Sequence, residues 1–171
     1  MNFARTIIAA CAVSLAFGAA PAFAQGQNTR GQAEKNIPDD TLKGPPIVFF
    51  ADLSADEESA VTESPGVGRF ECSLERETLK LTWKVTYSNT TSPLTSASIH
   101  GPQTPGGEAA VLIDLGGKGL KSPIEGSKII SPGDLEYLLT GRMYVNLHSV
   151  KYPAGELRGQ LSRQRPKEPT S

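Results

Sequence analysis

Two histidines, His100 and His148, are the side chains best suited to metal or proton chemistry near neutral pH, and the 171-residue sequence has no others. Neutral imidazoles bind copper and zinc, and thiolates or carboxylates complete many such sites. Cys72, Glu156 or Asp114 could therefore add a third ligand. Nothing in the spacing brings these groups together, so a copper or zinc site at His100 and His148 is one of two interpretations.

The other interpretation, which we favour, is a buried network of hydrogen bonds rather than a solvated groove. Tyr144, Asn146 and His148 alternate with apolar residues and so share one face of an extended strand. Their side chains each donate and accept hydrogen bonds, which lets them hold a strand in register. Backbone or side-chain groups beside the Gly101-Pro102 turn would likewise satisfy the ring of His100. The candidate members of this network, or of a ligand site, are Tyr144, Asn146, Tyr152, Glu156 and Arg158.

Residues 152–156 read Tyr-Pro-Ala-Gly-Glu and predict a turn into the last strand. Proline fixes φ there, and glycine adopts a backbone conformation that other residues resist. Glu156 and Arg158 fall on one face of that strand, where they could pair with each other or with charges on neighbouring strands. Such a pair stabilises a protein little when it is exposed and more when it is enclosed.

The other reactive side chains favour structural roles. The segment from Asp52 to Glu63 is acidic but lacks the residue order of a calcium-binding EF-hand loop, so we expect a solvated acidic loop. Trp83 and Cys72 lie in alternating stretches and are expected in the core. The sequence has neither a Gly-x-Ser-x-Gly elbow nor a phosphate-binding glycine loop. We therefore expect a protein that is not an enzyme.

The first 24 residues are predicted to be a cleaved export signal. Arg5 precedes an almost wholly apolar run over residues 6–20, and Ala22-Phe23-Ala24 has the small-x-small pattern of a secretory cleavage site. The run is short for a membrane span. Cys11 lies inside the signal, so Cys72 is left without a disulfide partner. We expect a periplasmic or secreted protein with no membrane span after cleavage.

The rest of the chain divides into one folded domain and two polar ends. Residues 25–46 and 163–171 have almost no large apolar side chains and are expected to be a disordered arm and a disordered tail. Residues 47–162 are long enough for one core. With 17 basic and 18 acidic residues, the chain has a net charge of −1 and lacks the basic surface of a nucleic-acid-binding protein.

Apolar residues of the domain recur mostly with a period of two, which predicts strands. One-sided alternation of this kind is typical of antiparallel sheets. Ser131-Pro132 predicts the start of one short helix, which Gly141 would end. The fold is therefore predicted to be an all-β antiparallel Greek-key sandwich or barrel with one short helix. The eight expected strands are 47–53, 67–74, 78–87, 95–100, 109–115, 127–130, 142–149 and 156–162.

Two segments resemble one known family, the CHRD domain. Residues 98–102 read SIHGP and residues 144–161 read YVNLHSVKYPAGELRGQL, which are similar to the family patterns HIHGPA and YVNVHTxxYPAGEIRGQL. Residues 53–61 and 66–70 correspond loosely to the element LSGAQEVPPV and to the glycine-rich step that follows it. The resemblance implies an immunoglobulin-like or superoxide-dismutase-like Greek-key fold, and it carries over no catalytic residue.

The resemblance also bears on the metal hypothesis. In the family pattern two histidines alternate on one strand face, and His148 would supply a third imidazole, as in copper/zinc superoxide dismutase. This sequence departs from the pattern at Ser98, which stands where the first histidine would be. Only His100 and His148 are left as imidazole ligands.

Three functions follow as hypotheses. The leading one is an exported, non-enzymatic CHRD domain that binds a protein or a cell-envelope component through strand faces and the loops at 54–66 and 101–108. The alternative is a periplasmic copper- or zinc-binding protein that uses His100 and His148. A structural or stress-accessory role in the periplasm is a third hypothesis, which the sequence does not rank against the first.

Overall fold

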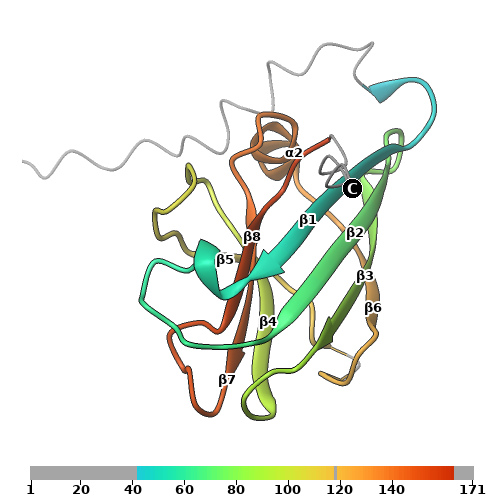
Figure 1. Ribbon diagram of the computed structural model, residues 1–171. Helices are drawn as coiled ribbons and strands as arrows, with labels where there is room; N and C mark the ends of the chain where they lie inside the picture. The colour runs from blue at the N-terminus through green and yellow to red at the C-terminus, as the bar shows by residue number, and fades with distance from the viewer. Residues whose placement is uncertain (1–41, 118, 164–171) are drawn as a thin grey trace, which may run out of the picture.

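The computed structural model describes residues 42–117 and 119–163 (Figure 1). The predicted signal, residues 25–41 of the predicted arm and residues 164–171 of the predicted tail lie outside these ranges. The guanidinium of Arg76 donates hydrogen bonds to the carbonyl oxygens of Lys43 and Pro45, both at 2.8 Å. The end of the arm therefore has defined contacts with the domain, which its composition did not predict.

Eight strands form one antiparallel sheet in the order β5-β4-β7-β8-β1-β2-β3-β6. The predicted all-β antiparallel class with one short helix is confirmed, whereas the immunoglobulin-like or superoxide-dismutase-like topology stays a prediction. The elements are β1 (Ile47–Ser54), the 3₁₀ turn η2 (Ala55–Glu57), β2 (Val67–Glu75), β3 (Lys80–Ser88), β4 (Leu94–His100), β5 (Val111–Asp114), β6 (Ile124–Ile129), α2 (Pro132–Leu139), β7 (Tyr144–Ser149) and β8 (Leu157–Gln160).

The sheet curls, and its inner face and α2 enclose the core (Figure 1). In β3, Leu81 and Val85 are 0% exposed and Trp83 is 6% exposed, while the polar residues between them face water. Burial of apolar surface stabilises such a core by about 25 cal/mol per Å². The alternating pattern of the sequence therefore places the core correctly. The structure also confirms the expected burial of Trp83 and Cys72.

The edge strand β6 departs from its predicted bounds because of a close approach to Trp83. The sequence predicts a strand over 127–130, but the strand begins at Ile124. A Cβ atom on Gly126 would lie 2.5 Å from Cζ2 of Trp83. The glycine is therefore a strand residue that leaves room for the indole of the neighbouring strand, and not a turn residue.

The outer face of the sheet has an exposed half and a covered half. Outward side chains of β2, β3 and β6 are exposed or partly exposed. Over β4, β7 and β8, two stretches of chain fold back across the sheet, residues 55–66 and 101–110, which we call the covering segments. All residues of β7 except His148 are buried as a result. The molecule thus has a second, polar interior, and most of the predicted site residues lie in it.

The helix α2 begins at a capping box. The hydroxyl of Ser131 accepts a hydrogen bond from the backbone N–H of Asp134 at 3.1 Å, and the Asp134 carboxylate accepts one from the Ser131 N–H at 3.3 Å. Leu135 and Leu138 are buried against the core. The reciprocal bonds satisfy N–H groups that have no partner within the first turn of a helix.

Replacing Ser131 with alanine should lower the free energy of unfolding by about 1 kcal/mol, because the hydroxyl that accepts from the Asp134 N–H is lost while the core is unchanged. Urea denaturation followed by circular dichroism measures this change. Ser127→Ala, at an exposed position of β6, is the matched control and should change stability by less than about 0.5 kcal/mol. Equal effects of the two substitutions would contradict a specific role for the cap.

Candidate functional site

Strand register brings the predicted site residues together on the outer face of β4, β7 and β8. His100 lies opposite Tyr144, and Ser98 lies opposite Asn146. Asn146 in turn lies opposite Arg158 of β8. Because side chains alternate along a strand, all of these groups point away from the apolar core and toward the covering segments.

The two imidazoles are held by backbone carbonyl groups. Nδ1 of His100 lies 2.9 Å from the carbonyl oxygen of Ala109, and Nδ1 of His148 lies 2.9 Å from that of Pro153. A carbonyl only accepts hydrogen bonds, so each Nδ1 carries a proton and donates it. Nε2 of His100 then accepts from the hydroxyl of Ser98 at 2.8 Å. Burial lowers the pKa of His100, which favours this neutral form.

Arg158 lies at the centre of the polar interior and is 1% exposed. Its guanidinium carbon lies 3.6 Å from the centroid of the Tyr144 ring, on which His100 also stacks at 4.9 Å. Nη2 donates to the carbonyl oxygen of Gly107 at 2.6 Å, and Nη1 lies 3.8 Å from a carboxylate oxygen of Glu108. The buried cation of Arg158 therefore joins β7 and β8 to the second covering segment.

Glu156 is fully buried and has its own set of donors. The Ser64 hydroxyl donates to its Oε1 at 2.7 Å, and the backbone N–H and hydroxyl of Thr91 donate to the same atom at 2.6 and 3.0 Å. Burial alone raises the pKa of this carboxyl, but the hydrogen bonds from Ser149, Ser64 and Thr91 outweigh that effect and hold the pKa below its usual value. Glu156 thus anchors the first covering segment, and Glu108 rather than Glu156 is the carboxylate that pairs with Arg158 among the described residues.

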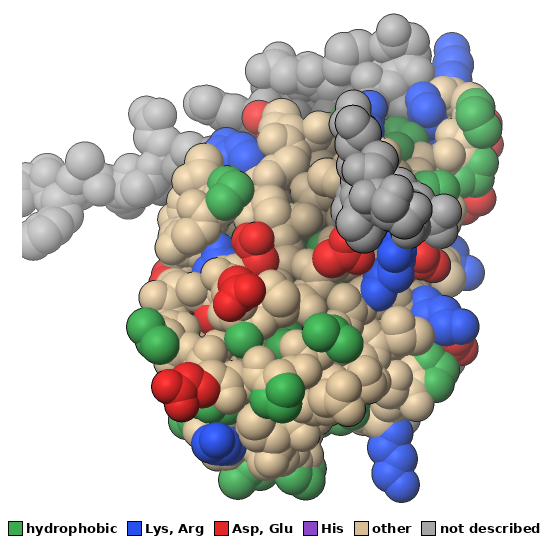
Figure 2. All heavy atoms as spheres, in the orientation of Figure 1, with side chains coloured by type: hydrophobic (Ala, Val, Ile, Leu, Met, Phe, Trp, Pro, Cys, Tyr) green, Lys and Arg blue, Asp and Glu red, His purple; other side chains and the backbone are tan. Residues whose placement is uncertain are grey.

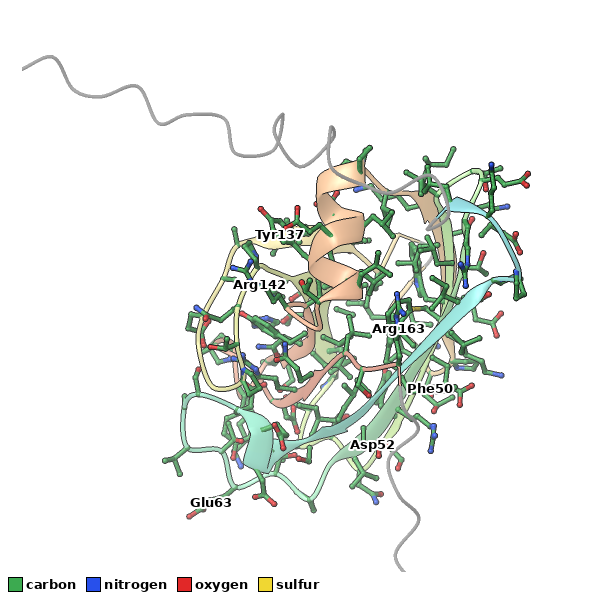
Figure 3. The ribbon with its side chains drawn as sticks, turned by 90° about the horizontal axis from the view of Figure 1, so that it is seen from above. Phe50, Asp52, Glu63, Tyr137, Arg142 and Arg163 are labelled. Carbon is green, nitrogen blue, oxygen red and sulfur yellow. The ribbon has the colours of Figure 1, made fainter. Side chains whose placement is uncertain are left out.

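Glu58, like Glu108, is a site residue that sequence reasoning missed. Glu63, another acid of the same segment, points into solvent (Figure 3), but the Glu58 carboxyl is half-buried. Its oxygens lie 2.6 and 2.7 Å from where a Cβ atom of Gly155 would be. Burial, as the largest cause, raises the pKa of Glu58 to about 7. The expectation of a wholly solvated loop is therefore wrong at Glu58. One signal was present, because Glu58 holds the position of the glutamate in the family element similar to LSGAQEVPPV.

The suggested third metal ligands lie in different places. Cys72 is 3% exposed within the core cluster, and burial raises the pKa of its thiol to about 12, so it does not join the histidines. Asp114 borders the same depression as His100 and His148.

Tyr152, a predicted member of the network, shapes the turn before β8. Its carbonyl oxygen accepts hydrogen bonds from backbone N–H groups of its own turn.

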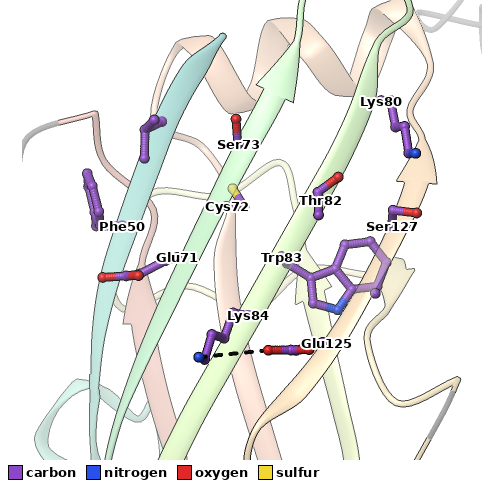
Figure 4. Close-up of a pocket in the computed structure, with 12 residues that line it drawn as sticks. Phe50, Glu71, Cys72, Ser73, Lys80, Thr82, Trp83, Lys84, Glu125 and Ser127 are labelled. Atoms are coloured by element: carbon purple, nitrogen blue, oxygen red, sulfur yellow. Dashed lines mark ion pairs between the residues drawn. The ribbon is translucent and has the colours of Figure 1, made fainter.

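Several shallow depressions on the described part of the chain are open to solvent, and two of them matter here. One, of about 600 Å³, lies on the outer side of β1, β2, β3 and β6, where Lys84 and Glu125 form an ion pair of 3.8 Å (Figure 4). The other, of about 440 Å³, lies beside the histidines and is the candidate binding site. It is lined by Thr95, Ser96, Ala97, Ser98, His100, Val111, Asp114, Gly116, Leu120 and His148.

Comparison with protein families gives one match. The model of the CHRD domain matches residues 49–161. The chain belongs to the CHRD domain family. CHRD domains are of the extracellular, binding type. The C-terminal motif of this CHRD domain builds β7, its turn and β8, which carry the polar interior.

Comparisons with curated proteins and with solved structures give no significant match. Among residues 42–117 and 119–163, no helix has the length and apolar character needed to cross a membrane.

Glu156→Gln should destabilise the domain at pH 7, by about 1–3 kcal/mol, because the charged hydrogen bonds to Ser64 and Thr91 are weakened. Because the pKa of Glu156 is lower in the folded state, its ionised carboxylate stabilises the fold at pH values above the ordinary pKa of 4.5. This stabilisation is lost as pH falls through the folded-state pKa. The difference between native chain and variant should therefore shrink below pH 4.5. Thermal melts from pH 3 to 7 measure it.

Glu136→Gln, which removes an exposed carboxylate of α2, is the matched control for the same melts. It should change stability little at any pH. A Glu156→Gln effect of constant size from pH 3 to 7 would contradict a role for the ionised carboxylate.

Proposed function

We propose that this CHRD domain is an exported, non-enzymatic binding module of the cell envelope, and that it binds a protein or envelope component at the depression beside His148. The observation that carries the proposal is the position of this depression beside β7 and the buried end of β4, which are packed on both faces. Its floor is held by the apolar core on one side and by the polar interior on the other. A preformed surface loses little conformational freedom on binding, which favours affinity.

The lining has the mixed chemistry of a recognition surface. Ser96 lies opposite His148 and is exposed, and Asp114 adds a carboxylate at the edge strand β5. Leu120 and Val111 add apolar contact area. A few polar groups set in a partly apolar depression are typical of binding sites. Acidic and basic side chains are interspersed on the face shown in Figure 2, so a nucleic-acid partner is not part of the proposal.

Export and location belong to the same proposal. We propose that residues 1–24 are removed during export and that the mature chain acts in the periplasm or is released from the cell. The small-x-small pattern at residues 22–24 supports the cleavage. We also propose that the curled sheet follows an immunoglobulin-like or superoxide-dismutase-like Greek-key path, which the family resemblance supports.

Binding should fail when the depression is filled. We expect Ser96→Arg to lower capture of the envelope partner at least tenfold, because the long side chain occupies the space beside His148. The measurement is cross-linking of the exported protein in an envelope fraction, with intact mass showing whether the chain begins at Gln25.

Thr82→Arg is the matched control for this test. Thr82 is also an exposed hydroxyl residue on the outer face, but it borders the other depression. It should leave capture unchanged. Capture that Thr82→Arg abolishes and Ser96→Arg spares would contradict the proposed site, and an uncleaved chain held in the cytoplasm would contradict export.

A second candidate function is copper or zinc binding by His100 and His148. Their ring centroids lie 6.2 Å apart, and both rings donate Nδ1–H to backbone carbonyl groups. Ligating histidines commonly make this outer hydrogen bond, which leaves Nε2 for the metal. Ser98 occupies Nε2 of His100 and opposes binding, and within the described ranges no three His, Cys, Asp or Glu residues are placed to hold an ion.

The second function predicts that copper or zinc binds the mature chain at about one ion per molecule and that His100→Ala/His148→Ala abolishes binding while the chain stays folded. Elemental analysis and metal titration measure this, with circular dichroism to report the fold. Ser98→Ala is the control, because it frees Nε2 of His100 without removing a ligand and should not weaken binding. Metal content at background in the native chain would reject this function.

A further inference from the structure

The first covering segment is fixed to the sheet at few points. Near its end, the Ser64 hydroxyl donates to Glu156 at 2.7 Å. In its middle, Ser59 donates a hydrogen bond to Glu108 of the second covering segment. Between β1 and Ser64, Glu58 is the one described residue whose charge-bearing side chain turns inward onto the site strands.

The place that Glu58 occupies fits a carboxyl group tightly. Gly155 has a φ of +139°, and both carboxylate oxygens of Glu58 lie within 2.7 Å of where a Cβ atom on Gly155 would be. Oε2 of Glu58 lies 3.5 Å from Nδ2 of Asn146. A side chain at residue 155 would take the space that the carboxyl fills, so the bare backbone at this turn and the inward carboxyl fit together.

The hydrogen bonds from Asn146 and Ser59 favour an ionised Glu58 carboxylate, but they leave one of its oxygens without a donor. The Oε1 atom of Glu58 is buried and has no hydrogen-bond donor. The Oδ1 atom of Asn146, a residue that is 1% exposed, also has none. Two acceptors without donors lie on neighbouring side chains. A proton on the Glu58 carboxyl would provide the missing donor, whereas an ionised carboxylate would leave a buried charge with an unpaired oxygen.

The charges that face Glu58 oppose one another. Arg158 of β8 favours the ionised form, and Glu108 of the second covering segment disfavours it. The phenol of Tyr144 on β7 also senses the Glu58 charge. Burial, the largest effect, exceeds the attraction of Arg158 and the hydrogen bonds from the Asn146 side chain and the Ser59 backbone, and the pKa of Glu58 is raised to about 7.

We infer that Glu58 is a proton-controlled latch: its protonated carboxyl holds residues 55–63 against β7 and the Gly155 turn, and its ionisation releases them. Ser64 keeps the far end of the segment attached through Glu156. Release would open the polar interior at Asn146 and Arg158 to solvent. The inference concerns the chain alone and does not depend on the binding partner proposed above.

The direction of the pH dependence follows from the raised pKa. A carboxyl whose pKa is higher when docked favours docking fully below its undocked value of 4.5, and this advantage is lost as pH rises through about 7. The docking equilibrium should fall by up to about tenfold for each pH unit between these values and then level off.

The test is ¹⁵N relaxation of the backbone amides of residues 55–63 at pH 5.5 and pH 8. We expect order parameters of about 0.85 at the lower pH and below about 0.6 at the higher pH. Glu58→Gln, a neutral copy of the protonated carboxyl, should keep the segment rigid at both values. Glu57→Gln, at the exposed neighbouring residue, is the matched control and should behave as the native chain.

A segment with the same order parameters at both pH values, or a Glu58→Gln variant that still loosens at pH 8, would overturn the latch. If residues 55–63 of the Glu58→Gln variant are mobile at both pH values, ¹³C titration of the Glu58 carboxyl in the native chain decides whether the latch exists. A midpoint above pH 6 supports the latch, and a midpoint below pH 5 overturns it.

Discussion

The buried guanidinium of Arg158 is the constraint on which the outer half of the molecule depends. A cation that is 1% exposed needs hydrogen-bond acceptors and nearby negative or polarisable groups, because its loss of hydration is large. Among the described contacts of this guanidinium, the β strands supply the ring of Tyr144. The carbonyl of Gly107 and the carboxylate of Glu108 come from the second covering segment, which must therefore lie across the sheet. The first covering segment adds Glu58, and the Ser59 bond to Glu108 links the two segments.

This arrangement gives β7 an unusual position for an antiparallel strand. Val145 and Leu147 face the apolar core, while Tyr144 and Asn146 face an interior of hydrogen bonds. Apolar packing fixes the strand but tolerates small shifts, whereas the polar side requires each donor to meet an acceptor. The two interiors thus make different demands on the same backbone. The depression beside His148 is open where the covered region ends, and its shape follows from both interiors.

The sequence predicted the parts of this structure that depend on local periodicity. Alternation along β3 identified its buried and exposed faces, and the polar face of β7 was visible as Tyr144, Asn146 and His148. It could not predict how the covering segments return to the sheet, because that depends on contacts between residues far apart in the chain. Glu58 was therefore interpreted as one solvated acid among several, although burial raises its pKa. Cys72 needed no such long-range information, because the alternation around it correctly placed it in the apolar core.

The contact between Trp83 and Gly126 also restricts how the sequence of this protein can evolve. An indole ring fills the space of the absent side chain on β6, with only 2.5 Å available to a Cβ atom. Enlarging residue 126 first would force the ring into its neighbours, whereas shrinking residue 83 first leaves a cavity that a larger residue could later fill. Descendants that lose the glycine should therefore be those that have already lost the tryptophan, so the order of mutations at these two positions is restricted by their shapes.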